Sequence, residues 1–186
     1  MLKHIVVTGG CALVALLVLM PRSFAAEDMS ESQLFHYLQD RIAIEDLVSR
    51  YSVALDSGDA QGYANLFATD GELTSQGKTY KGREAILESL RGALRSPADE
   101  EAALARGEKV RRLRHLISGV KIDIDGDRGM VRANWVTVSM APDNRPGIWG
   151  MGYFDDAVVK ENGQWLFATH NLIVELQSGP PPASGQ

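Results

Sequence analysis

The chain has 186 residues and a formal net charge of −5, from 24 acidic residues against 19 lysines and arginines. This acidic balance argues against binding to nucleic acid or to an anionic membrane surface, because both need clustered positive charge. The length suits a single folded domain, and the only cysteine, Cys11, lies in the N-terminal segment. The rest of the chain therefore has no disulfide and no thiol nucleophile.

Residues 1–25 have the pattern of a secretion signal, with an apolar run at 11–20 and a small-x-small cleavage site at Ser23-Phe24-Ala25. The apolar run is short for a transmembrane helix. We expect cleavage after Ala25 and a periplasmic or secreted protein, with an uncleaved membrane anchor as the alternative. We assign residues 26–177 to one domain and predict that the Gly- and Pro-rich tail, residues 178–186, is disordered.

The first half of the domain is predicted to be helical. Apolar residues recur every three or four positions over residues 30–57, Ser30 and Gln33 fit a capping box, and Gly58 suits the end of the helix. Two shorter helices are expected at 60–67 and 83–94, with a turn at 69–71 and a small hairpin of 72–75 and 78–80 between them. Residues 95–110 leave two alternatives, a capped helix over 100–106 or a charged loop.

From residue 112 onward the period of the apolar residues changes to two, which predicts strands at 112–124, 129–141, 148–160 and 165–176. Asp125-Gly126 and Asn162-Gly163 are typical of tight hairpin turns. Helices followed by an antiparallel meander indicate an α+β domain. The economical packing is a curved sheet wrapped around the long first helix, with a pocket between them.

Asp56 and His115 are the principal candidates for chemistry. Asp56 lies in the last turn of the first helix, where the negative end of the helix dipole favours a positive neighbour. His115 opens the first long strand, and strict alternation would place it on the polar face. A bulge at Ser118-Gly119 would return it to the interior, and spacing alone does not decide between the two. A paired carboxylate and imidazole can act as a general base.

Two other polar residues lie on predicted apolar faces. His170 is the one polar member of its strand face, either a core histidine bonded to a backbone carbonyl or a pocket-floor imidazole that orients a substrate oxygen. Tyr51, about one turn before Asp56, either packs in the core or donates its hydroxyl to a substrate. Aromatic residues that either fill the core or line a substrate pocket are Trp135, Trp149, Tyr153 and Phe67.

Motifs of other chemistries are missing from the sequence. It contains no HExxH zinc motif, no Gly-rich phosphate loop after the signal segment and no GxSxG nucleophile elbow. We therefore expect neither a metal nor a cofactor, and a small molecule as the substrate.

The chain resembles the SnoaL-like branch of the nuclear transport factor 2-like superfamily in three segments, RIAIEDLVSRYSVALDSGDAQGYANLFATDGELTSQGKTYKGREAI, RHLISGVKIDIDGD and VVKENGQWLFATHNLIV. The resemblance implies a cone in which three or four N-terminal helices pack in the concave face of a curved, mixed, mainly antiparallel sheet. It is closest to the lyase members, namely scytalone dehydratase, hexachlorocyclohexane dehydrochlorinase and bile-acid 7α-dehydratase.

In those lyases an Asp at the end of the first helix and a His opening the sheet form the catalytic dyad. Their positions match Asp56 and His115 here, which implies that His115 lies inside. The bile-acid enzyme also has a tyrosine at the position of Tyr51. A departure occurs at His170, where two of the lyases have an arginine that contacts the leaving group or substrate.

The resemblance implies a cofactor-free lyase in which His115, polarised by Asp56, takes a proton, while Tyr51 and His170 bond the leaving or carbonyl oxygen. The expected substrate is a small hydroxylated cyclic or aromatic compound that loses water or another small group such as formaldehyde. The alternatives are a cofactor-free isomerase or polyketide cyclase, and a non-catalytic periplasmic binding protein. The resemblance also implies a homotrimer or homodimer formed through the sheet.

Overall fold

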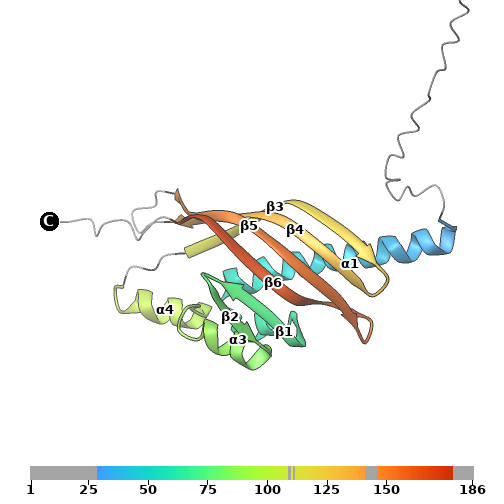
Figure 1. The fold of residues 1–186 in the computed structure, drawn as a ribbon. Helices are drawn as coiled ribbons and strands as arrows, with labels where there is room; N and C mark the ends of the chain where they lie inside the picture. The colour runs from blue at the N-terminus through green and yellow to red at the C-terminus, as the bar shows by residue number, and fades with distance from the viewer. Residues whose placement is uncertain (1–28, 109, 111, 141–145, 178–186) are drawn as a thin grey trace, which may run out of the picture.

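The computed structural model describes residues 29–108, 110, 112–140 and 146–177. The predicted signal segment, its cleavage site and the C-terminal tail lie outside the described residues. Four helices are present in the described part, α1 (Glu31–Ser57), α2 (Ala60–Ala64), α3 (Arg83–Leu90) and α4 (Pro97–Ala105). Six strands accompany them, β1 (Phe67–Ser75), β2 (Lys78–Lys81), β3 (Arg112–Asp125), β4 (Arg128–Met140), β5 (Pro146–Glu161) and β6 (Gln164–Gln177) (Figure 1).

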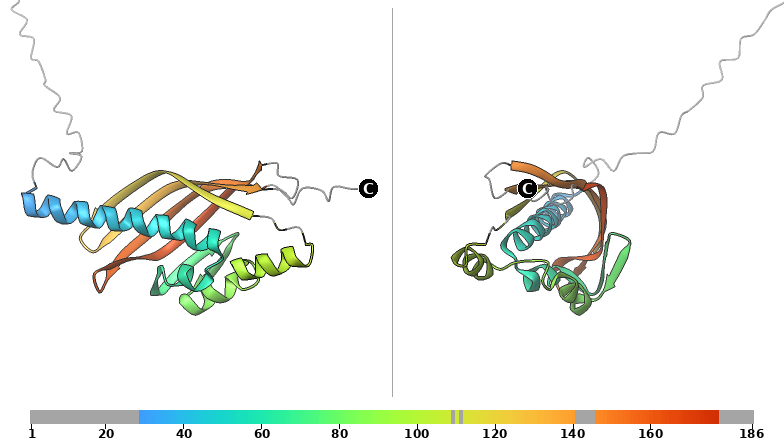
Figure 2. Two further views of the ribbon diagram at one scale, coloured as in Figure 1. Left: turned by 180° about the vertical axis from the view of Figure 1, so that it is seen from behind. Right: turned by 90° about the vertical axis from the view of Figure 1, so that its left-hand side faces the viewer.

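The strands form one curved sheet in the order β2-β1-β6-β5-β4-β3. β1 runs parallel to β6, and every other neighbouring pair is antiparallel. The long strands β3 to β6 wrap around α1, while the short helices lie at the end of the sheet that carries β1 and β2 (Figure 2). The expected α+β fold, a mixed and mainly antiparallel sheet around the first helix, is confirmed.

The ends of α1 follow from local chemistry. Ser30 accepts a hydrogen bond from the backbone N–H of Gln33, and the Gln33 side chain accepts one from the Ser30 N–H, so the predicted capping box is confirmed. Gly58 ends the helix at φ +70°, a left-handed conformation that suits glycine. A Cβ at this position would also collide with the Arg95 carbonyl oxygen.

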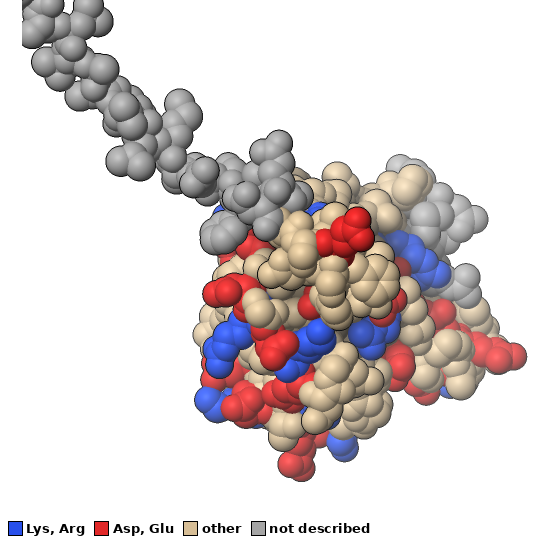
Figure 3. All heavy atoms as spheres, turned by 90° about the vertical axis from the view of Figure 1, so that its right-hand side faces the viewer, with Lys and Arg blue, Asp and Glu red and all other residues tan. Residues whose placement is uncertain are grey.

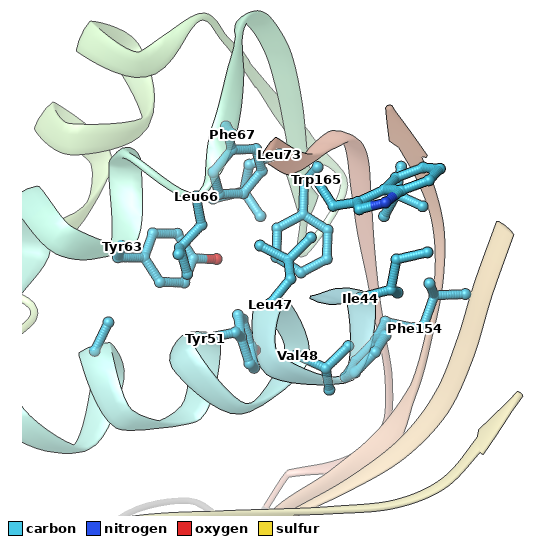
Figure 4. Packing of buried hydrophobic residues seen from close by; sticks show 14 of the residues in the cluster. Ile44, Leu47, Val48, Tyr51, Tyr63, Leu66, Phe67, Leu73, Phe154 and Trp165 are labelled. Carbon is cyan, nitrogen blue, oxygen red and sulfur yellow. The ribbon is translucent and has the colours of Figure 1, made fainter. Parts of the chain in front are cut away.

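Only the second half of α1 contributes fully to the core. Its buried residues are Ile44, Leu47, Val48, Tyr51 and Ala54. The N-terminal end of α1 projects beyond the sheet (Figure 1), and Phe35, Leu38 and Ile42 of this half remain exposed. In the core, residues of α1 such as Leu47 meet Phe154 and Trp165 of the sheet and Tyr63 and Phe67 of the next elements (Figure 4).

Several predicted boundaries were wrong, those at β1 for a tertiary reason. The second helix stops at Ala64, because Phe67 begins β1 and pairs with Phe167 in the parallel ladder, where the Phe167 N–H donates to the Leu66 carbonyl. β1 continues through the predicted turn at 69–71 by means of an irregularity between Phe67 and Glu72. The third helix ends at Leu90 rather than at residue 94.

Residues 95–110, for which a helix and a charged loop were both open, contain the helix α4. α4 starts three residues earlier than the predicted 100–106 helix, with Ser96 as its N-cap and Pro97 in its first turn. Ser96 and Asp99 form a second capping box. No helix among the described residues is both long and apolar enough to cross a membrane.

A bulge in β3 decides which way His115 faces. The β3–β4 register shifts between Ser118 and Lys121, and Gly119 lies at φ +63°. Before the shift, the alternate residues His115 and Ile117 therefore face α1, on the same side as the buried Ile122 that follows the shift. Of the two alternatives that the spacing left open, the structure has the bulge at Ser118-Gly119.

We expect Gly119→Val to lower the free energy of unfolding by about 1–2 kcal/mol, because a β-branched residue is strained at a left-handed φ. Urea unfolding at neutral pH measures the difference. Gly119→Asn is the matched control, since asparagine tolerates this conformation and its Cβ would meet only the Asn134 side chain. Equal stability of the Val and Asn variants would contradict the assigned bulge.

Asp40 ties α1 to the β5–β6 hairpin. Its Oδ1 accepts hydrogen bonds from the Lys160 Nζ at 2.7 Å and the Trp165 Nε1 at 2.9 Å. Burial raises the pKa of Asp40, but the bonds from Lys160 and Trp165 outweigh this effect and hold the pKa below its usual value. The carboxylate therefore stabilises the fold at neutral pH.

We expect Asp40→Asn to lower the free energy of unfolding by about 1 kcal/mol at neutral pH. A folded-state pKa below the unfolded value gives stability that is lost as the pH falls through the folded pKa. The difference between wild type and variant should therefore shrink in acid, which urea unfolding near pH 7 and near pH 3 would measure. Asp46→Asn, which removes an exposed partner of Arg50 on the same helix, should change little at either pH.

Candidate active site

Asp56 and His115 meet at the junction of α1 and β3. The His115 Nδ1 lies 2.8 Å from the Asp56 Oδ1, and the backbone N–H of His115 donates to the same oxygen at 3.1 Å. One carboxylate oxygen thus holds both the ring and the main chain of the histidine. Both side chains are partly buried, with 17% of His115 and 21% of Asp56 exposed.

This geometry sets the state of the imidazole. Because a carboxylate oxygen accepts, the Nδ1 of His115 carries the hydrogen, and the Nε2 of the neutral ring carries a lone pair. A lone pair on a ring held in one orientation is what a general base needs. The two residues predicted from the sequence are brought together as expected.

Tyr51 and His170 also meet, but deeper in the domain. Their ring centroids lie 4.8 Å apart, and both residues are almost fully buried. Tyr51 precedes Asp56 by five residues, about 7.5 Å along the helix axis. Burial and the negative charge of Asp156 raise the pKa of Tyr51 far above its usual value, so its hydroxyl stays a neutral donor.

Asp156 is the partner of His170, and sequence reasoning missed it. The His170 Nδ1 lies 2.9 Å from the Asp156 Oδ2, and the backbone N–H of Asn171 donates to Oδ1 at 3.0 Å. The backbone-carbonyl alternative for His170 is therefore wrong. A signal existed, because Asp156 shares the strand alternation of the buried Phe154 and Val158.

The predicted aromatic lining residues lie in different places. Trp135 is buried and uses its Nε1–H to donate to the Ile173 carbonyl at 3.2 Å, and Phe67 is fully buried in the core. Trp149 is half-buried at a register shift in β5. The next residue, Gly150, pairs with Thr137, which in turn pairs with His115.

Tyr153 lies on the convex face of the sheet, which corrects its predicted place in the pocket. It alternates with the buried Phe154, pairs with the exposed Asn134, and stacks under the Arg132 guanidinium at 4.6 Å from the ring centroid. The predicted face of the strand was therefore wrong for Tyr153.

Two buried polar residues were missed in the sequence. Thr137 and Ser139 lie at the end of β4 nearest His115.

A hollow of about 170 Å³ lies away from the Asp56–His115 pair. It is smaller than most ligand pockets, which start near about 300 Å³, and the residues around it are Lys121, Asp123, Met130, Val131, Arg132 and Asp155. It includes none of the predicted site residues. Among the described residues, no group of three or more His, Cys, Asp or Glu side chains is placed to hold a metal ion.

Comparisons with known proteins agree with this architecture. The family model of the SnoaL-like domain matches residues 36–171. A Mycobacterium tuberculosis protein of unknown function (Rv3472) has a similar structure, with 28% identity, a TM-score of 0.62, and coverage of 76% of this chain and 75% of that one. No curated protein matches the chain.

Two structures from Novosphingobium aromaticivorans are also similar. A candidate scytalone dehydratase is 26% identical, with a TM-score of 0.62 and coverage of 78% of this chain and 90% of its own. A nuclear transport factor 2-like protein with a cystatin-like fold is 23% identical, with a TM-score of 0.60 and coverage of 76% and 88%. The chain therefore belongs to the SnoaL-like domain family and has the nuclear transport factor 2-like fold.

Proposed function

We propose that the protein is a lyase in which His115, polarised by Asp56, removes a proton from the substrate. The observation that carries this proposal is the pair of contacts at 2.8 and 3.1 Å that fix the ring and main chain of His115 on one carboxylate oxygen. The chemistry needs no cofactor, because the side chains themselves supply the base. The likeness to a candidate scytalone dehydratase supports loss of water as the reaction.

His115 and Asp56 alone account for every proton transfer and bond change in the elimination. The His115 Nε2 takes a proton from a substrate carbon, the electrons of the C–H bond form the double bond, and the C–O bond to the leaving hydroxyl breaks. The imidazolium that forms is stabilised by Asp56 and returns the proton to the leaving oxygen, so water departs. If His115 instead takes the proton of a substrate hydroxymethyl group, the O–H electrons form the C=O bond of formaldehyde and the carbon–carbon bond breaks. The electrons of that bond stay on the remaining substrate carbon, which takes the proton back from the imidazolium.

Tyr51 and His170 define the inner end of the site in this proposal. The neutral hydroxyl of Tyr51 donates to a carbonyl or leaving oxygen of the substrate, and aromatic rings surround both residues. A hydroxylated ring compound fits such a mixture of apolar walls and few polar groups. Trp135 and Phe67 contribute to the apolar packing, and Trp149 lies nearer the Asp56–His115 pair.

We expect His115→Ala and Asp56→Asn each to reduce turnover by roughly 10²–10⁴-fold, because each removes part of the general base. Loss of water from scytalone, followed by absorbance, is the first assay. His36→Ala is the control, since His36 is exposed on α1 and bonds only its own helix in the described contacts. Full turnover in both dyad variants would overturn the proposal.

A second experiment, with ring ketones as ligands, separates the two alternative functions. Ring ketones incubated in heavy water reveal proton abstraction without elimination, which would indicate an isomerase or a cyclase built on the same dyad. Binding of a ring compound with neither exchange nor elimination would indicate a binding protein, since this fold by itself does not determine function.

We also propose a secreted or periplasmic protein that associates with itself through the convex face of the sheet. The signal pattern of residues 1–25 supports the location. A row of apolar residues that crosses four neighbouring strands on that face supports the association. The row consists of Leu116, Val136, Met151 and Leu176. Leu116, Met151 and Leu176 are 55%, 37% and 52% exposed in the single chain.

Another part of the surface has a different character. The face seen in Figure 3 intersperses acidic and basic side chains and shows no continuous basic patch among the described residues. This mixture agrees with the proposal that neither nucleic acid nor an anionic membrane is a partner.

We expect Met151→Lys to convert a dimer or trimer into monomers, because it places a charge in the middle of the apolar row. Analytical ultracentrifugation of both proteins measures the change. Met130→Lys is the matched control, since Met130 is 53% exposed outside this row. A monomeric wild type would contradict the association.

A further inference from the structure

The Asp156–His170 pair contains an unpartnered nitrogen. The His170 Nε2 is the one buried side-chain nitrogen or oxygen in the described part of the chain without a hydrogen-bond partner. The opposite side of the ring is fully engaged, with Nδ1 on the Asp156 carboxyl group at 2.9 Å. Natural proteins rarely leave such an atom unsatisfied, and exceptions often mark a functional site.

The surroundings of this pair are dry. Both side chains have no exposed area. Four aromatic rings enclose the imidazole, with centroid distances of 4.8 Å for Tyr51, 5.2 Å for Phe154 and Phe167, and 6.2 Å for Phe67. A net charge in such a place is expensive, so the pair is most stable when its total charge is zero.

Two arrangements have zero total charge and leave Oδ1 of Asp156 without a hydrogen, free to accept the Asn171 N–H. Either an Asp156 carboxylate faces a His170 imidazolium, or a protonated Asp156 donates to Nδ1 of a neutral ring. The hydrogen lies on Nε2 in both arrangements. Burial raises the pKa of Asp156 more than His170 and the Asn171 N–H lower it. The nearby Tyr51 and Tyr63 stay neutral because burial raises their pKa as well.

We propose that Asp156 positions His170 as a buried hydrogen-bond donor, and that its Nε2–H binds an acceptor oxygen, such as a ring carbonyl, at the inner end of the substrate. This assignment rests on the proposed function for the identity of that ligand. An oxygen reaches Nε2 only when the surrounding rings move apart, and the hydrogen bond then formed favours that movement. Asp156 acts through His170 and is a positioning residue.

The two histidines thus have opposite tasks. Asp56 and His115 are partly exposed, and the neutral His115 offers a lone pair. Asp156 and His170 are fully buried, and His170 offers a hydrogen. Similar pairs of residues take different roles in one domain because their environments differ.

Imidazole proton–nitrogen correlation spectra of the nitrogen-labelled protein test the assignment. We expect the His170 Nε2 to carry a hydrogen near pH 7, because both arrangements place one there. Signals are assigned with His36→Gln and His115→Gln. An unprotonated His170 Nε2 near pH 7 would overturn the inference, whatever the result of the turnover assay on His115.

Variants of Asp156 separate positioning from mere packing. In Asp156→Asn the amide oxygen accepts the Asn171 N–H and the amide nitrogen donates to Nδ1, so the Nε2–H is kept. In Asp156→Leu the ring loses its partner, and the Nε2–H signal should give way to a mixture of tautomers. Asp155→Leu, one residue away and paired with Arg132, is the matched control that should leave the His170 signal unchanged. An unchanged signal in Asp156→Leu would contradict the positioning role, and the wild-type spectrum remains decisive if that variant does not fold.

Cyclohexanone is the probe for the ligand role. We expect saturable binding that shifts the His170 Nε2–H signal of wild type and Asp156→Asn, with roughly five- to tenfold weaker binding to Asp156→Leu. Cyclohexane, which lacks the oxygen, should leave this signal in place. Absence of any shift with cyclohexanone would contradict the assignment of His170 as a ligand donor.

Discussion

The hydrogen bonds between Asp56 and His115 join the end of the first helix to the first long strand, and the candidate site depends on this junction. The Asp56 Oδ1 holds both the ring and the backbone of His115. The curved sheet wraps around α1 at this place, and the bulge at Gly119 directs His115 toward the helix. Without the bulge the histidine would face away from the helix, and without the curvature of the sheet the carboxylate would be out of reach.

A second constraint comes from burial. The aromatic cluster around His170 admits a titratable pair only when the two groups satisfy each other, as Asp156 and His170 do at 2.9 Å. The more open Asp56–His115 pair keeps contact with solvent, since 17% of His115 and 21% of Asp56 are exposed. In the proposed function, two carboxylate–imidazole pairs at different depths give one fold both a base and a hydrogen-bond donor. The SnoaL-like family and its fold do not by themselves specify this division.

Much of the architecture could be predicted because it depends on local chemistry. The capping box of Ser30 and Gln33, the C-terminal Gly58 and the hairpin turns are short-range features, and all of them are observed. Errors arose where partners distant in the chain decide. Phe67 joins a strand because β6 offers it a parallel ladder, and Tyr153 faces outward because its register with β4 places it beside Asn134.

By itself, the sequence determined most of the order of helices and strands, the candidate bulge site at Gly119, and the residue types of the Asp56–His115 pair. These features depend on periodicity, turn residues and glycine conformations, which act over a few positions. The tertiary structure decided which residues meet. It showed that Asp156 is the partner of His170, that the first half of α1 projects from the core, and that Tyr153 lies on the convex face. These outcomes depend on strand register and on the curvature of the sheet, which arise only when distant segments pack together.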